Sequence, residues 1–159
     1  MRVRRISVIG AGSFGAGGED RWLETEAESL GKLIADKGWE LVCGGLGGVM
    51  EAACRGAFLA GGSTLGLLPG QDVDSANRWV SIPVATGLGQ MRNHLVVLNG
   101  VAAVACGGGA GTLSEIGHAL KSGRKVVAIG KWSELDGVIP ATGAVEAVSK
   151  LKIILDGER

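Results

Sequence analysis

Short apolar runs alternate with longer amphipathic stretches along most of the chain. An unbroken apolar run, the pattern of a strand buried on both faces of a parallel sheet, stands at residues 101–106, and strands are also predicted at 5–9 and 125–129. Further strands are predicted at 39–45, 63–68 and 80–84, with a short one at 138–139. Because Pro83 lies inside the strand at 80–84 and cannot donate a ladder hydrogen bond, that strand is expected at the sheet edge or to end early.

Between these strands, apolar residues recur at helical spacing. The predicted helices cover 19–37, 90–99, 143–155 and the segments that follow the glycines at 44–48 and 107–111. The side chains expected to face inward include Trp22, Leu23, Ala27, Leu30, Leu33 and Ile34 in the first helix and Val145, Val148 and Leu151 in the last. Alternating strands and helices predict an α/β fold: a single Rossmann-like domain over 1–159, with a doubly wound, mostly parallel sheet and helices on both faces.

Glycine is concentrated where the predicted strands end. It accounts for 29 of the 159 residues, or about 18% (29/159), whereas its average usage in proteins is about 7%. A glycine loop that leads into a helix at the carboxyl end of a parallel strand is where open α/β sheets bind anions, because the first N–H groups of the helix are free to donate. Several such loops are expected at one edge of this sheet, which favours a phosphorylated heterocycle, such as a mononucleotide or a pterin phosphate, as the ligand.

The first glycine loop matches the dinucleotide-binding fingerprint only in part. Gly10, Gly12 and Gly15 have its spacing and follow a predicted strand. The fingerprint also requires an acidic residue at the end of the second strand, to hold the ribose hydroxyls. Here that end carries Cys43 and a glycine, while Glu40 stands at the opposite end. A tight turn is therefore favoured over NAD binding.

Charge and cysteine content restrict the partners and the compartment. Sixteen basic residues balance sixteen acidic ones, so the chain lacks the basic footprint of a nucleic-acid binder and no nucleic-acid partner is expected. Its three cysteines fit no zinc spacing, so no metal site is predicted, and a reduced cytoplasmic location is expected. No apolar run reaches the length of a membrane span, so no membrane association is expected.

Four motifs together resemble one known superfamily. These are GGLGGVMEAACRGA at 44–57, GGSTLGLLPG at 61–70, TGLGQMRN at 86–93 and CGGGAGTLSEIGHALKSGRKVV at 106–127. They are similar to motifs of the Lonely Guy (LOG) superfamily, also known as SLOG or lysine decarboxylase-like proteins. Within it, the chain most resembles the branch of molybdenum cofactor carriers. The resemblance extends from the first strand to about Ile129.

The resemblance implies a binding function and leaves open whether the chain is an enzyme. LOG phosphoribohydrolases, which release free base and ribose 5-phosphate from nucleoside 5′-monophosphates, carry P-G-G-x-G-T-x-x-E and an upstream arginine, usually followed by lysine. Here Cys106 replaces the proline beside one extra glycine, and Asn93 replaces the lysine. Both departures resemble the carrier branch. The resemblance therefore implies a carrier of molybdenum cofactor or of an AMP-like nucleotide; the alternative is a phosphoribohydrolase, in which Arg92 and Glu115 would be catalytic. Lysine decarboxylation is not expected.

The residues expected to contact the ligand lie in the glycine loops and just after them. They are Gly12, Ser13, Gly44, Gly45, Gly47, Arg92, Asn93, Gly107, Gly108, Gly109, Gly111, Thr112 and Glu115. A cation near a helix N-terminus is unfavourable unless an anion is also present, which favours a ligand role for Arg92. Glu115 has two interpretations: it contacts the ligand, or it closes a capping box with Thr112, since Thr-x-x-Glu is also that motif.

The predicted helix at 90–99 also suggests an assembly. Its run of apolar residues at 95–98 covers more of the helix circumference than one sheet face can bury. A homodimer through this helix is predicted, with Val96 or Val97 pointing away from the sheet, and the resemblance implies a homodimer or a homotetramer. His94 and His118 are interpreted as packing or surface residues, and Cys43 and Cys106 as small apolar core residues.

Overall fold

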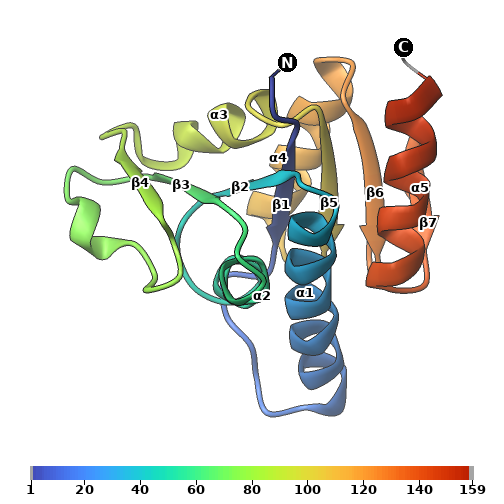
Figure 1. Cartoon of the computed structure of the whole chain (residues 1–159), viewed down its shortest axis with the longest axis horizontal. Coiled ribbons are helices and arrows are strands. Elements are labelled where there is room, and N and C mark those ends of the chain that lie inside the picture. The colour runs from blue at the N-terminus through green and yellow to red at the C-terminus, as the bar shows by residue number, and fades with distance from the viewer. Residues whose placement is uncertain (1, 158–159) are drawn as a thin grey trace.

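A parallel sheet with helices on both of its faces forms the molecule (Figure 1). The computed structural model describes residues 2–157. The strands are β1 (Arg5–Gly10), β2 (Glu40–Cys43), β3 (Thr64–Leu68), β4 (Ile82–Ala85), β5 (Ala102–Cys106), β6 (Lys125–Ile129) and β7 (Val138–Ala141), in the spatial order β4-β3-β2-β1-β5-β6-β7. All neighbouring pairs are parallel. The doubly wound α/β fold predicted from the sequence is confirmed.

Five helices cover the two faces of the sheet in the described part of the chain. They are α1 (Gly18–Asp36), α2 (Val49–Leu59), α3 (Arg92–Leu98), α4 (Ala110–Lys121) and α5 (Ala144–Gly157), with short 3₁₀ turns at Val73–Ser75 and Gly89–Met91. Helix α1 packs against α2 and α5 over one apolar core, and α3 packs against α4 over a second. Because successive strand residues alternate between these two cores, the sheet is buried on both sides, as its unbroken apolar runs predict.

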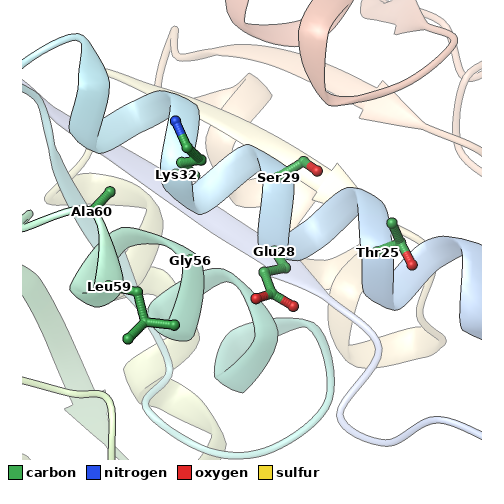
Figure 2. Close-up of a pocket in the computed structure, with 7 residues that line it drawn as sticks. All are labelled: Thr25, Glu28, Ser29, Lys32, Gly56, Leu59 and Ala60. Atoms are coloured by element: carbon green, nitrogen blue, oxygen red, sulfur yellow. The ribbon is translucent and has the colours of Figure 1, made fainter.

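Helices α1 and α2 cross at very short range because both present glycine at the contact. A Cβ atom added at Gly31 would lie 1.8 Å from the carbonyl oxygen of Ala53, and one added at Gly56 would lie 1.9 Å from that of Glu28. Beside the crossing lies a hollow of about 410 Å³. Figure 2 shows its lining residues: Thr25, Glu28, Ser29, Lys32, Gly56, Leu59 and Ala60. None of them is a predicted ligand residue.

Several local expectations are corrected. Helix α1 begins at Gly18, so an irregular segment separates β1 from it where the dinucleotide fingerprint has a tight turn. Trp22 and Val145, expected to face inward, are 41% and 75% exposed. Each lies on the edge of a helix stripe that the neighbouring helices do not cover. Pro83 does lie in an edge strand, β4, as its missing N–H donor requires.

Candidate functional site

The loops that follow β1, β2 and β5 meet at the carboxyl edge of the sheet. Strand β1 pairs with both β2 and β5, so the chain winds in opposite directions from this point. The loops touch through their backbones: the Ala11 N–H donates to the Cys106 carbonyl at 3.2 Å, and the Val49 N–H donates to the Ala11 carbonyl at 2.8 Å. A Cβ atom at Gly48 would lie 2.1 Å from that same Ala11 oxygen. Glycine is therefore required for the loops to approach so closely.

A polar pocket of about 270 Å³ opens between these loops and the start of α3 and α4. Of the predicted ligand residues, it brings together Gly12, Gly44, Arg92, Asn93, Gly109, Gly111, Thr112 and Glu115. These residues come from four separate segments of the sequence. Each segment lies at or just after the carboxyl end of a strand, which is why the parallel sheet collects them at one edge.

The remaining predicted ligand residues, Ser13, Gly45, Gly47, Gly107 and Gly108, do not line this pocket. Gly45 has φ of +78° and packs under Leu68, and Gly108 packs under the Thr112 side chain. Gly107 faces Leu23 and lines a separate hollow of about 190 Å³ at the start of α1, together with Gly108. Gly45, Gly107 and Gly108 therefore contribute to the packing of the loops outside the pocket.

Arg92 is the cation of the pocket, and it is only 7% exposed. Its Nη2 donates to the Gly44 carbonyl at 3.3 Å, and its Nη1 donates to the Asn93 side-chain oxygen. Its Nε is buried and has no hydrogen-bond partner among the described residues. Burial lowers the pKa of Arg92, while Glu115 and Cys43 act in the opposite direction. A buried guanidinium with an unused donor is suited to receive an anion.

Glu115 lines the same pocket as Arg92 and is 8% exposed. Burial raises the pKa of its carboxyl group to about 7, and the attraction of Arg92 offsets only part of that rise. No ion pair or hydrogen bond joins Glu115 to another residue in the described part of the chain. The carboxyl group therefore titrates near neutrality inside the pocket.

The capping-box interpretation of Glu115 is wrong. Helix α4 begins three residues earlier than a cap at Thr112 requires: its N-cap is Gly109, and Thr112 lies inside the first turn. No side chain caps this helix end. Thr112 is 4% exposed and packs over Gly108. Glu115 consequently falls in the second turn, where its side chain reaches the pocket instead of the helix terminus.

The predicted ligand residues left out six that line the pocket: Val8, Ile9, Gly10, Leu46, Met50 and Gln90. Gln90 accepts a hydrogen bond from the Asn93 side-chain nitrogen at 3.3 Å, so it completes a chain of contacts through Asn93 to Arg92. Its place in the TGLGQMRN motif, two positions before Arg92, was the signal that could have found it. The sulfur of Met50 lies against Gly44, where it closes one wall.

Over residues 2–157, no group of three or more histidine, cysteine, aspartate or glutamate side chains is placed to hold a metal ion. No helix in this range is long and apolar enough to span a membrane.

Fold and pocket together define the class of protein: an open α/β protein with a polar pocket at the point where its parallel sheet changes winding direction. Proteins of this class bind their ligands at that place. The SLOG cluster4 family model matches residues 3–154, and the chain belongs to this family. An uncharacterized protein of Archaeoglobus fulgidus is 39% identical over 149 residues, which cover 94% of this chain and 95% of that protein.

Two solved structures are similar over almost their whole length. The molybdenum cofactor binding protein of the phototrophic bacterium Rippkaea orientalis is 36% identical, with a TM-score of 0.88 over 98% of this chain and 99% of that one. The molybdenum cofactor carrier protein of Chlamydomonas reinhardtii is 35% identical, with a TM-score of 0.85 and the same coverage. These neighbours match the carrier branch that the sequence motifs resemble.

Proposed function

We propose that this protein binds a phosphorylated small molecule in the Arg92 pocket and carries it, with molybdenum cofactor as the ligand. The observation that supports this most directly is the buried Arg92 guanidinium, whose Nε has no partner in the described protein. An ion buried without a full set of partners is costly, so the site is built for an anion that supplies them. The two carrier-type neighbours at 35–36% identity support molybdenum cofactor as that ligand.

The binding mode follows from the residues around the pocket. Arg92 would hold the ligand phosphate together with the N-terminus of α4, where Gly111 and Thr112 line the pocket and no side chain caps the first-turn N–H groups. Glu115 would then contact the organic part of the ligand. A pterin carries N–H donors that a carboxylate accepts, and when Glu115 is protonated it donates to carbonyl or hydroxyl groups instead.

The pocket fits the organic part of molybdenum cofactor better than its metal. Cysteine is absent from the pocket lining, so the described residues offer no thiolate ligand for molybdenum there. Arg92 matches a terminal phosphate, and a volume of about 270 Å³ suits a ligand of mononucleotide size. A carrier that binds the phosphate and the pterin leaves the metal to the ligand's own donors, so the protein can release the cofactor intact.

A nucleotide hydrolase is the second candidate, because a buried carboxylate opposite an arginine also suits cleavage of an N-glycosidic bond. In that reaction Glu115 would position or deprotonate water beside an oxocarbenium-like transition state. A pKa of about 7 leaves a sizeable fraction of Glu115 ionised at neutral pH, which a general base requires. The side chain of Asn93 is tied to Arg92 and Gln90, so it adds no second proton donor of the lysine type.

Thermal-shift titration tests the binding proposal. AMP, other mononucleotides and pterin phosphates are added to the protein, and a ligand at 100 times its dissociation constant should add about 2.7 kcal/mol to the free energy of unfolding. Arg92→Ala should abolish the shift, while Arg21→Ala, at an exposed position of α1, should leave it intact. No shift from any of these ligands at millimolar concentration would refute the proposal. Release of free base from AMP, lost in Glu115→Gln, would instead establish the hydrolase.

An assembly is also proposed, through the surface around α3 and α4. The predicted dimer contact through Val96 or Val97 is wrong in its details, because both side chains are almost completely buried inside the chain, at 0% and 1% exposure. The exposed apolar residues nearby are Leu88, Met91, Leu98, Leu113 and Val101. Of these, Leu88 and Met91 line a hollow of about 700 Å³ between α3 and α4. Light scattering is expected to report a homodimer or homotetramer, and a monomer would refute this proposal.

A further inference from the structure

Two buried cysteines from different elements touch directly behind the Arg92 pocket. Cys43 is the last residue of β2, and Cys54 lies in the second turn of α2. Their sulfur atoms are 3.5 Å apart, and the Gly45 N–H donates to the Cys43 sulfur at 3.3 Å. Both side chains are fully buried. The two thiols are therefore close enough to react with each other after a small movement.

The two sulfur atoms differ in their readiness to carry charge. The hydrogen bond from Cys54 lowers the pKa of Cys43, assisted by the Gly45 N–H and by Arg92, while burial opposes them. The same hydrogen bond and burial raise the pKa of Cys54. Burial raises the pKa of the third thiol, Cys106, to about 12. Since the thiolate is the nucleophile in thiol chemistry, Cys43 is the reactive member of the pair.

Cys43 is also coupled to the pocket through its neighbour Gly44. The Gly44 carbonyl accepts a hydrogen bond from Arg92, and a Cβ atom at Gly44 would lie only 2.7 Å from the Arg92 Nη2. On the other side, Gly45 packs against Leu68. A displacement of Cys43 toward Cys54 therefore moves the carbonyl that holds Arg92, because no free space separates them.

We propose that Cys43 and Cys54 are a redox-sensitive pair: they form a disulfide on oxidation, and this bond weakens the binding of the ligand by Arg92. The two sulfur atoms approach from 3.5 Å to a bond of about 2.05 Å. The oxidant is hydrogen peroxide: the Cys43 thiolate attacks one oxygen, the O–O bond breaks, and a sulfenic acid and hydroxide form. The hydroxide takes up the proton that the Cys43 thiol released and leaves as water. The Cys54 sulfur then displaces the hydroxyl group, which leaves as a second water with the Cys54 proton. The effect on the ligand rests on the proposed function, whereas disulfide formation does not.

A reducing compartment keeps Cys43 and Cys54 in the dithiol form. The cytoplasmic location that the sequence predicts has a thiol-reducing poise, so the dithiol form binds the ligand there. During peroxide stress the disulfide form releases it. The simpler interpretation of both cysteines, as small apolar core residues, makes the opposite prediction: their sulfurs stay reduced for as long as the protein is folded.

The experiment treats the folded protein with hydrogen peroxide, then alkylates free thiols after denaturation and digests with trypsin. Cleavage after Lys37 and Arg55 places both cysteines in one peptide, 38–55, while Cys106 falls in 93–121. Peptide 38–55 is expected to be free of alkylation and lighter by two hydrogen atoms, with Cys106 alkylated normally. Cys106→Ala should behave as the unmodified protein does, and Cys54→Ala should lose the response. Full alkylation of peptide 38–55 would overturn the proposal.

The effect of the disulfide on ligand binding is measured in a separate experiment. Oxidation should weaken AMP binding about tenfold, in the usual range of coupling between sites, and dithiothreitol should restore it; unchanged affinity after disulfide formation overturns the coupling. If the reduced protein binds no AMP, the proposed function fails for that ligand, and the peptide assay still decides whether the disulfide forms. Modification of Arg92 by phenylglyoxal, read as missed cleavage between 79–92 and 93–121, then reports the coupling. Equal modification rates in the dithiol and disulfide forms overturn it.

Discussion

At Glu115, burial and the nearby arginine pull the pKa of one carboxyl group in opposite directions, and burial prevails. Its folded-state pKa of about 7 lies above the ordinary value of 4.5. The native state therefore binds more protons than the unfolded state between these two pH values. Because the pKa is raised, the stability that Glu115 contributes is fully present below pH 4.5 and is lost as pH rises through 7. Above pH 7, the buried and ionised carboxyl group of Glu115 therefore lowers the stability of the folded protein.

Glu115→Gln is expected to remove this pH dependence. Glutamine has the same shape and no charge, so the variant should match the unmodified protein at pH 4 and exceed its stability at pH 8. The difference is on the order of 3 kcal/mol, from a shift of this size at about 1.4 kcal/mol per pKa unit. Urea denaturation at both pH values measures it, with Glu134→Gln, at an exposed position, as the control. Parallel pH profiles of the unmodified protein and Glu115→Gln would contradict the assigned burial cost.

Gly44→Ala tests whether the backbone beside Arg92 sets the position of the guanidinium. The added Cβ would lie 2.7 Å from Arg92 Nη2 and 2.8 Å from the Met50 sulfur, both at the ends of flexible side chains. The protein should therefore fold with a loss of about 1 kcal/mol, while Arg92 is displaced and AMP binds about tenfold more weakly. Gly70→Ala, where a Cβ meets nothing within 4 Å, is the matched control. An affinity that is the same in both variants would show that Arg92 tolerates the displacement.

At the scale of elements, the crossing of α1 and α2 depends on two glycines that face backbone atoms. A Cβ at Gly31 or Gly56 would overlap a carbonyl oxygen of the other helix, which no side-chain rotation relieves. Arg55 of α2 adds a polar clamp at the same contact, since its guanidinium pairs with Glu28 at 2.9 Å and with Glu24 at 3.3 Å. The close approach lets the small-residue helix α2 cover β1, β2 and β3.

Gly31→Ala and Gly56→Ala should each destabilise the fold by about 1–3 kcal/mol or more, because the helices must separate. Gly117→Ala in α4 is the matched helical control: its Cβ would meet nothing within 4 Å. Alanine has the higher helix propensity, so the control should stabilise the protein by up to about 1 kcal/mol. Thermal denaturation measures all three, and equal effects at the three positions would contradict the close helix contact.

At the scale of the whole molecule, the apolar surface beside α3 and α4 adjoins the ligand pocket. Gln90 and Asn93 line both the pocket and the neighbouring hollow. His94 and His118 stack edge to face across that hollow, with ring centroids 4.7 Å apart, so the predicted packing role of the two histidines matches their contact. A second copy of the chain on this surface would cover residues next to the site, which links assembly to binding.

Met91→Glu should dissociate the proposed assembly. Met91 is 76% exposed, so the charge costs the isolated chain almost nothing, whereas in a subunit contact it would be buried without a partner. Ile153→Glu, at a site 72% exposed on α5, is the control and should leave the assembly intact. Light scattering measures the mass of each variant. An unchanged oligomer in Met91→Glu would place the contact elsewhere on the molecule.

The sequence by itself determined the layers and the edge at which the site lies. The apolar runs indicated strands buried on both faces, and glycines at their carboxyl ends mark loops that a parallel sheet brings together. Pro83 could be assigned to an edge because its missing donor is a local property. Arg92 and Glu115 were likewise chosen from their motifs, and both line the pocket.

Only the tertiary structure decided the finer points, each of which depends on contacts between distant segments. Whether Glu115 caps α4 depends on where that helix begins; its N-cap is Gly109, and the Thr112 side chain packs over Gly108. Val96 and Val97 are buried because two helices share that face of the sheet. The contact between Cys43 and Cys54 arises because α2 lies against the end of β2. Spacing along a chain predicts which face a residue lies on, but the neighbour that occupies that face is set by packing.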